Sequence, residues 1–406
     1  ALLASVARVR LTGDGGGLSE QLGRIKEPVT PTRTARNVSG LGSQPRVAAS
    51  PKLEFFNGLG GFAEDGREYV ITLGPGQSTP APWINVVANQ GFGFQVSAEG
   101  CGFCWSVNSR EHQLTPWSND PVTDRPGEAI YLRDEDSGEL WSPTALPIRD
   151  DSGVYVARHG WGYSRFEYEA HGISSELLSF VPVADPIKLT RLKLRNTTNR
   201  PRHLSIAAYV EWVLGTSRAA SAPFVSTEID PDLNAMFARN PWNAAFADRV
   251  AFLDLGGRHS SWTADRREFI GRNGCLSNPA ALSGSTRLSD TVGAGLDPCG
   301  AMITVIELAP HAETEIVILL GDAEGPEQAS ALITRYRDAN LDAVLAEVLE
   351  QWEDLLGAVQ VKTPDRSMDI MLNGWLLYQT IACRLWARSG FYQASGAYGF
   401  RDQLQD

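Results

Sequence analysis

Several features that define large classes of proteins are missing from this sequence of 406 residues. No run of about 18 apolar residues occurs, which excludes a transmembrane helix within these residues. The first residues lack the charged and then apolar layout of a secretory signal. Five cysteines, an odd and small number for this length, favour reduced thiols over a disulfide framework. We therefore expect a cytoplasmic protein with a hydrophobic core large enough to need no disulfide or metal.

Positive charge is also scarce, because 36 Lys and Arg residues face 48 Asp and Glu residues and give a formal net charge of -12. An acidic surface repels the phosphates of nucleic acids and anionic lipid head groups. We therefore expect no nucleic-acid partner and no membrane contact by this segment. A neutral sugar is compatible with this charge.

Motifs for nucleotides, metals and serine hydrolysis are absent as well. No G-x-G-x-x-G between a strand and a helix, no GK[ST] and no G-x-S-x-G occur. The glycine-rich stretch Leu53–Phe62 is therefore expected to be a tight turn. Six histidines are dispersed without metal-ligand spacing, so we expect no metal site. Cys101 and Cys104 form either a redox or metal pair or, as we favour, two small residues of a strand.

Strand signals dominate from Leu53 to Leu320, where Gly and Pro interrupt short runs of Val, Ile, Tyr, Phe and Trp. Polar turns between alternating apolar residues predict three hairpins, over residues 187–214, 303–320 and 131–141. So many strands and turns favour a large antiparallel sandwich.

Helical signals begin at Pro326. Apolar residues at three-and-four spacing predict one helix from Pro326 and a second over 341–356. A third predicted helix runs from Thr363 to about Ala387 and is apolar nearly all round, so other helices should surround it. Because the chain ends soon afterwards, we expect most of those neighbours to lie in missing sequence.

The stretch 388–406 combines glycines and small residues with aromatics, Arg, Asp and Gln. Small residues let the backbone approach a ligand closely. Amides, carboxylates and guanidinium groups bind sugar hydroxyls, and aromatic faces pack on sugar C–H surfaces. The stretch is therefore a candidate sugar site, and the alternative is an ordinary loop with a structural Arg–Asp pair. Two Pro-Trp corners, at Trp83 and Trp117, either face a sugar or are buried.

Five segments stand out together, in the order Leu53–Thr72, Pro82–Val86, Leu114–Trp117, Tyr209–Gly215 and Gly399–Asp406. In this order they resemble glycoside hydrolase family 94 over residues 50–406. The nearest resemblance is to the phosphorylase-like domain of cyclic β-1,2-glucan synthases and to 1,2-β-oligoglucan phosphorylases.

This resemblance implies a mostly β chain with a C-terminal α region: a large antiparallel β-supersandwich, a helical linker and the first part of an (α/α)6 barrel. Four regions follow. Residues 1–50 would connect to an upstream domain, 51–322 form the sandwich, 323–362 the linker and 363–406 the start of the catalytic barrel. Domains upstream of such a connector could anchor the parent protein in the inner membrane.

The resemblance also implies inverting phosphorolysis of β-1,2-glucan, which releases glucose 1-phosphate. The sugar-binding Arg and Asp of the family match Arg388 and Asp402, and Arg401 and Gln403 flank Asp402. The general acid Asp of relatives lies further downstream, so we expect it beyond Asp406 and expect this fragment alone to be inactive. No metal or organic cofactor is implied, and inorganic phosphate is a co-substrate.

Two alternatives stay open. The chain could be a non-catalytic module for glucan binding or length control, or a phosphorylase of another β-linked disaccharide such as cellobiose. Cellobiose phosphorylases have a further Arg where this sequence has Gly396 and Ala397, which argues against cellobiose. The expected partners are a β-glucan oligosaccharide and phosphate; the sandwich would shape the acceptor side and could form a homodimer.

Overall fold

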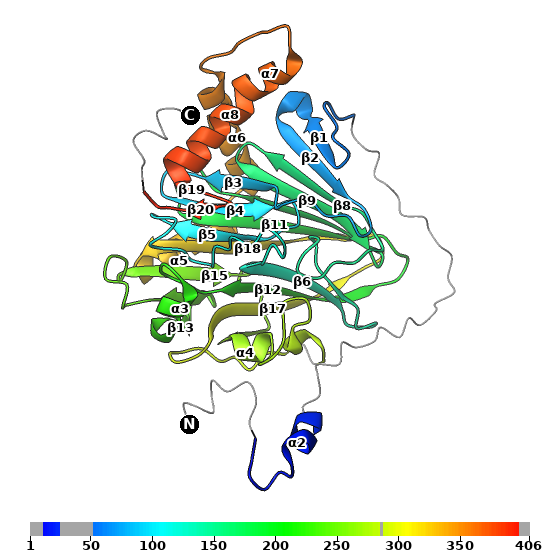
Figure 1. The fold of residues 1–406 in the computed structure, drawn as a ribbon, viewed down its shortest axis with the longest axis vertical. Coiled ribbons are helices and arrows are strands. Elements are labelled where there is room, and N and C mark those ends of the chain that lie inside the picture. Colours follow the sequence, from blue (N-terminus) through cyan, green and yellow to red (C-terminus); the bar gives the residue numbers. More distant parts are fainter. Residues whose placement is uncertain (1–10, 25–51, 285–286, 398–406) are drawn as a thin grey trace.

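The computed structural model describes residues 11–24, 52–284 and 287–397, and Figure 1 shows their arrangement. Antiparallel sheets dominate, and long helices follow them towards the C-terminal end. The largest sheet has ten strands. In sheet order they are β1 (Gly60–Ala63), β2 (Glu68–Leu73), β8 (Tyr155–Gly160), β9 (Tyr163–Ala170), β10 (Ile173–Phe180), β11 (Ile187–Asn196), β18 (Glu313–Glu324), β15 (Arg249–Asp254), β14 (Met236–Arg239) and β13 (Ser226–Ile229).

Two smaller sheets accompany the ten-stranded sheet. The five-stranded sheet has the order β16 (Ser261–Asp265), β17 (Pro298–Leu308), β12 (Arg202–Glu211), β6 (Glu128–Asp134) and β7 (Leu140–Trp141). The three-stranded sheet has the order β3 (Ile84–Ala88), β4 (Phe92–Ser97) and β5 (Gly102–Ser106). The mostly antiparallel sandwich expected from the sequence is therefore confirmed.

The ten-stranded sheet is buried on both of its faces. Along β11, Leu192 and Leu194 belong to the apolar core that also holds Leu204 of the five-stranded sheet. Ile187 and Leu189 belong to a second core, which contains the apolar side chains of the helices. Successive side chains of a strand point to opposite faces, so a strand that is apolar on both faces marks a central layer.

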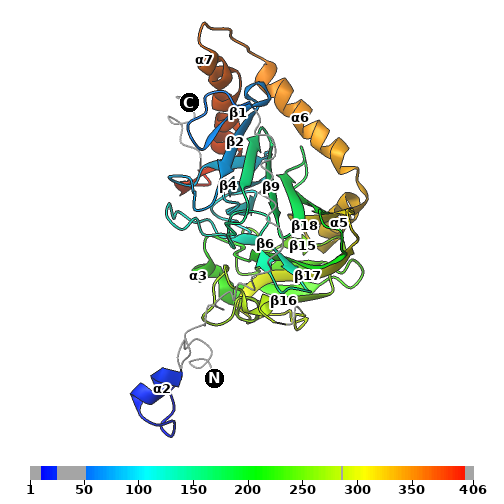
Figure 2. The same cartoon turned by 90° about the vertical axis from the view of Figure 1, so that its right-hand side faces the viewer.

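Helices α5 (Pro326–Asp338) and α6 (Leu341–Gly357) cover the outer face of the ten-stranded sheet, as Figure 2 shows edge-on. Pro326 begins α5 at the first helical position. The side chain of Asn340 caps α6 by accepting from the N–H groups of Asp342 and Ala343. Both helices lie where the apolar spacing predicted them, and the residues that the structure buries in α5 are Ala329, Leu332, Ile333 and Tyr336.

Two of the three predicted hairpins are wrong. β11 and β12 follow each other through residues 197–201, yet β11 pairs with β10 and β18, whereas β12 pairs with β17 and β6. β17 and β18 are likewise consecutive but belong to different sheets. Both turns are arches that carry the chain from one layer of the sandwich to the other. A short polar turn fits an arch as well as a hairpin, so the sequence pattern could not distinguish them.

The third hairpin is confirmed, because Leu132 of β6 pairs with Trp141 of β7. Cys104 lies within β5 and Cys101 directly before it, and both are buried free cysteines. Burial raises the pKa of both thiols well above the usual range. Neither is therefore a reactive thiolate, and the interpretation as small residues of a strand agrees with this.

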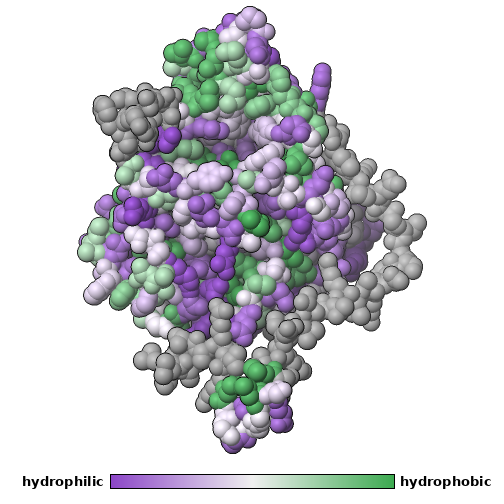
Figure 3. All heavy atoms as spheres, viewed as in Figure 1, coloured by the Kyte–Doolittle hydropathy of each residue, from purple (hydrophilic) through white to green (hydrophobic). Residues whose placement is uncertain are grey.

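The C-terminal helical segment consists of α7 (Arg366–Ile370), the π-helical turn η4 (Met371–Trp375), α8 (Leu376–Gln379) and the π-helical turn η5 (Thr380–Ala387). Its inner face is buried on the sandwich. Its outer face exposes Met368, Leu372 and Leu376, four residues apart, within the part of the chain that the structure describes. Hydrophobic residues gather at this end of the surface in Figure 3. The expectation of an all-round buried helix is thus met on one face only.

The predicted connector, residues 1–50, falls largely outside the described residues. Within it the structure shows the helix α2 (Leu18–Arg24). Among the described helices, none has the length and apolarity needed to cross a membrane.

Candidate functional site

The end of the C-terminal helical segment is held on the sandwich by two buried aromatic side chains. The indole Nε1 of Trp375 donates to the carbonyl of Gly66 at 2.7 Å. The Tyr378 hydroxyl donates to the carbonyl of Val86 at 2.9 Å, and its ring packs edge-on against Trp352 of α6. Because these contacts join distant parts of the sequence, they fix where the chain leaves the helix after Ala387.

Arg388 is the first residue after this helix and adopts the left-handed conformation, with φ 50° and ψ 39°. For a residue other than glycine this conformation costs of order 1–3 kcal/mol and persists only where neighbours hold it. Here its N–H donates to the carbonyl of Cys383. Its own carbonyl accepts from the Ser109 hydroxyl at 3.2 Å and from the Ser395 N–H at 3.1 Å. Arg388 is therefore fixed from both sides.

A short hairpin of β19 (Ser389–Gly390) and β20 (Gln393–Ala394) follows, and a sandwich loop at 107–111 supports it. Nη2 of Arg388 donates to the carbonyl of Val107 at 3.1 Å. The Asn108 side chain donates to the carbonyl of Gly396 at 3.0 Å. Gly396 has φ +60°, and a Cβ atom there would lie 2.0 Å from Asn108 Oδ1. Only glycine fits this position without displacing the loop.

The hairpin and the helix end line an open hollow of about 200 Å³, smaller than the roughly 300–1,000 Å³ of most small-ligand sites. Its lining offers a guanidinium, an amide, hydroxyls and an aromatic ring, the groups that bind sugar hydroxyls and C–H faces. Tyr392 is 72% exposed at its rim. Among the residues that line it are Cys383, Arg388, Tyr392, Gln393 and Ser395. Burial raises the pKa of the Cys383 thiol to about 12, so the hollow holds no thiolate nucleophile.

The structure places one of the four predicted sugar-binding residues. Arg388 lines the hollow. Arg401, Asp402 and Gln403 lie outside the described residues, so their roles stay predictions. The sequence does not predict the role of the loop at 107–111. Its Asn and Ser residues mark a turn, but nothing in the sequence indicates that the turn contacts a hairpin far along the chain.

The two Pro-Trp corners are partly buried. Trp83 and Trp117 each pack against an apolar core. Asn85, close to the first corner, is 3% exposed, and its amide donates to the carbonyls of Gly160 and Tyr163 at 3.0 and 2.9 Å. Because its polar groups bond to the sandwich itself, the buried alternative holds for this corner.

A larger hollow between β9 and α6 is lined by charged residues that pair with one another. Nε of Arg158 donates to Glu167 at 2.7 Å, and the Tyr163 hydroxyl donates to Glu68 at 2.6 Å. These pairs lie within the sheet and satisfy four of the polar residues of this hollow, whereas Arg165 Nε and Trp161 Nε1 are buried without a hydrogen-bond partner among the described residues. In residues 11–24, 52–284 and 287–397, no group of three His, Cys, Asp or Glu residues is placed to hold a metal ion.

Comparison with known proteins gives two family matches. The model described as "Glycosyl hydrolase 94, supersandwich domain" matches residues 67–339. The model described as "Glycosyl hydrolase 94 superfamily, catalytic domain" matches residues 351–406.

Three curated relatives cover most of the chain. The cyclic beta-(1,2)-glucan synthase NdvB of Rhizobium meliloti (strain 1021) is 46% identical over 354 residues, which are 87% of this chain and 12% of the synthase. The N,N'-diacetylchitobiose phosphorylase of Vibrio proteolyticus is 29% identical over 86% of this chain and 44% of its own. The solabiose phosphorylase of Paenibacillus borealis is 27% identical over 86% and 45%. The chain thus spans less than half the length of each of these relatives.

Proposed function

Because the chain belongs to glycoside hydrolase family 94, we propose that it is part of an inverting glycoside phosphorylase that acts on β-1,2-glucan. The observation that supports this substrate is the identity of 46% with a cyclic beta-(1,2)-glucan synthase, against 29% and 27% with phosphorylases of other disaccharides. The parent protein is accordingly proposed to be of the cyclic glucan synthase type.

In the proposed reaction, a carboxylic acid donates its proton to the glycosidic oxygen while a phosphate oxygen attacks the anomeric carbon from the opposite face. The glycosidic C–O bond breaks, and glucose 1-phosphate leaves with inverted configuration. Phosphate takes the place of the activated water, so one protein carboxylate suffices. We propose that this general acid is supplied by sequence that follows Asp406 in the longer relatives, and that residues 1–406 alone are inactive.

The proposed role of Arg388 is to bind hydroxyls of the sugar at the non-reducing end. Support comes from its placement: the side chain lines the hollow and donates to Val107, and the backbone carbonyl accepts from Ser109 of the sandwich loop and Ser395 of the hairpin. Asp402, with Arg401 and Gln403 beside it, is proposed to complete this site. No metal or organic cofactor takes part in the proposal, and phosphate is the co-substrate.

The proposed domains follow the same assignment. Residues 51–322 form the sandwich, 323–362 the helical linker and 363–406 the first part of the (α/α)6 barrel, with 1–50 as the connector to an upstream domain. The sandwich is proposed to shape the acceptor side and to form a homodimer. We propose a cytoplasmic location for this segment, with any membrane anchor in upstream domains.

The test is the release of glucose 1-phosphate by the complete gene product. β-1,2-Gluco-oligosaccharides and cellobiose are each incubated with and without inorganic phosphate. We expect phosphate-dependent release from the β-1,2-linked substrate only. Release from cellobiose would move the proposed specificity to another linkage. Binding of β-1,2-glucan without release from any substrate would replace the proposal with a non-catalytic glucan-binding module.

A further inference from the structure

Two aromatic rings are stacked on the surface away from the hollow. Trp242 is 72% exposed and Phe224, at the end of the 3-10 turn η2 (Ala222–Phe224), is 37% exposed. Their ring centroids are 4.8 Å apart and their planes differ by 10°. Keeping large apolar surface in water is unfavourable, and exposed apolar patches with polar rims mark interaction sites.

The loop that carries Trp242 is held in place by its own hydrogen bonds. The side chain of Asn240 donates to the carbonyl of Leu214 at 2.9 Å and accepts from the N–H of Trp242 at 3.2 Å. Further along the same loop, Phe246 stacks on the buried His112 ring at 4.5 Å. The indole is therefore presented on an ordered backbone, which lowers the entropy cost of binding.

The same sandwich loop that supports Arg388 also contacts the Trp242 loop. Nδ2 of Asn243 donates to the carbonyl of Glu111 at 3.1 Å, while Ser109 donates to the carbonyl of Arg388. Figures 1 and 2 place α3 (Arg218–Ser221), which leads into η2, on the same side of the molecule as β19 and β20. A ligand longer than one sugar unit could thus extend from the hollow towards the aromatic pair.

We propose that Trp242, backed by the stacked ring of Phe224, forms a stacking platform for a glucose unit of a longer β-glucan chain whose end occupies the hollow at Arg388. The C–H face of a pyranose carries partial positive charge and packs on the negative face of an aromatic ring. Arg110 and Glu111, both exposed and 3.5 Å apart in an ion pair, lie on the adjoining loop and provide charges of both signs. That rim suits a neutral polar ligand. The aromatic pair is also small beside the area of roughly 1,000 Å² that a specific protein interface needs.

This inference rests on the proposed function, and the two can fail separately. The complete gene product is compared with its Trp242→Ala and Trp242→Phe variants, and with Phe56→Ala as a matched exposed aromatic of the N-terminal strand region. Phosphorolysis of sophorose, the β-1,2-linked disaccharide, is measured beside that of a longer linear β-1,2-gluco-oligosaccharide. Binding of the longer sugar is measured by calorimetry without phosphate, so that the platform is tested even if no sugar is cleaved.

We expect Trp242→Ala to raise KM and Kd for the longer sugar about tenfold and to leave kcat and the KM for sophorose unchanged. Trp242→Phe should retain most of the binding, and Phe56→Ala should have no effect. The platform would be overturned if Trp242→Ala had the same kcat and KM as wild type on both substrates. An equal loss of kcat/KM on both substrates would overturn it as well. A change of oligomeric state in Trp242→Ala, seen by light scattering, would overturn it in favour of a protein interface.

Discussion

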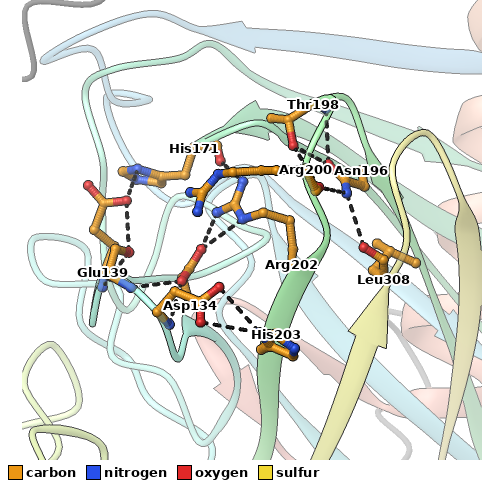
Figure 4. Close-up of polar contacts among 11 residues, drawn as sticks. Asp134, Glu139, His171, Asn196, Thr198, Arg200, Arg202, His203 and Leu308 are labelled. Atoms are coloured by element: carbon orange, nitrogen blue, oxygen red, sulfur yellow. Dashed lines mark hydrogen bonds and ion pairs between the residues drawn. The ribbon is translucent and has the colours of Figure 1, made fainter.

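Arginine has a structural role in one region of the molecule and lines a hollow in another. At the sandwich arches, Arg202 is 1% exposed, pairs with the buried carboxylate of Asp134 through Nε at 2.8 Å, and donates to the carbonyl of His171. Figure 4 shows this cluster beside Asn196, whose amide donates to the carbonyl of Leu308 at 3.0 Å. At the terminal hairpin, Arg388 is only half-buried and lines a hollow.

The difference separates a structural polar cluster from a candidate binding site. At the arches, the side chains bond to one another and to the carbonyls of the neighbouring arch, so their hydrogen bonds hold two layers together. At the hairpin, the backbone carbonyl of Arg388 makes structural bonds, and Nη2 of its side chain adds one to the carbonyl of Val107. Its side chain faces a space that can hold a ligand. Loss of the first arginine should therefore affect folding, and loss of the second should affect binding.

The largest expected effect is on stability at the arches. Arg202→Met leaves the carboxylate of Asp134 buried without its partner, which typically costs 3–5 kcal/mol. We expect a loss of about that size in the free energy of unfolding, measured by urea denaturation. Arg67→Met is the matched control, because the ion pair of Arg67 with Glu353 is exposed on both sides. It should cost less than about 1 kcal/mol. Equal losses in both variants would contradict the structural assignment of Arg202.

The second expected effect is a pH dependence of stability that comes from His159 in the sandwich. Burial lowers the pKa of His159 to about 4, against about 6.5 in an unfolded chain. On acidification the unfolded state takes up the proton first. The contribution of the neutral His159 to the free energy of unfolding is therefore complete above pH 6.5. It is lost as the pH falls towards 4, by up to about 3 kcal/mol.

The measurement is the free energy of unfolding at pH 7.5 and pH 4.5 for wild type and His159→Gln. We expect a smaller loss in the variant, because glutamine does not titrate and can keep a hydrogen bond to Ser164. Equal losses on acidification in both proteins would show that His159 is not the titrating group.

A smaller effect concerns the hairpin. Gly396→Ala places a Cβ atom against Asn108 Oδ1 and forces a left-handed alanine, at a cost of roughly 1–3 kcal/mol. Because the hairpin can relieve this strain by shifting locally beside the hollow, we expect KM for the glucan to rise about tenfold, with the urea midpoint of the protein nearly unchanged. Gly357→Ala at the end of α6, where a Cβ atom meets nothing within 4 Å, is the matched control. A fall in stability with unchanged KM would assign Gly396 to folding instead.

The fold class followed from the sequence because alternating apolar residues and helical spacing are local signals. They placed strands such as β11 and helices such as α5 at nearly their observed positions. They could not show strand partners. Residues 197–201 form an arch because Asn196 bonds to Leu308, a residue far along the chain, and no local pattern records that contact.

The candidate site was predictable in part for the same reason. Glycines, aromatics and Arg388 at the C-terminal stretch indicated a place where backbone and sugar could meet. The support of Arg388 by Val107 and Ser109 depends on how two distant segments pack. Trp242 was not singled out either, because a tryptophan in a sequence is more often buried, and only the structure shows its exposure.

One experiment tests the contrast between the arches and the terminal hairpin most directly. The free energy of unfolding and the rate of glucose 1-phosphate release are both determined on Arg388→Met in the complete gene product. Methionine keeps the apolar stem and removes only the guanidinium, and Arg335→Met on the exposed side of α5 is the matched control. We predict unfolding within about 1 kcal/mol of wild type and a loss of about 10- to 100-fold in kcat/KM, the size expected for losing hydrogen bonds from a charged donor. Full activity in Arg388→Met, or a loss of activity fully explained by unfolding, would contradict the account.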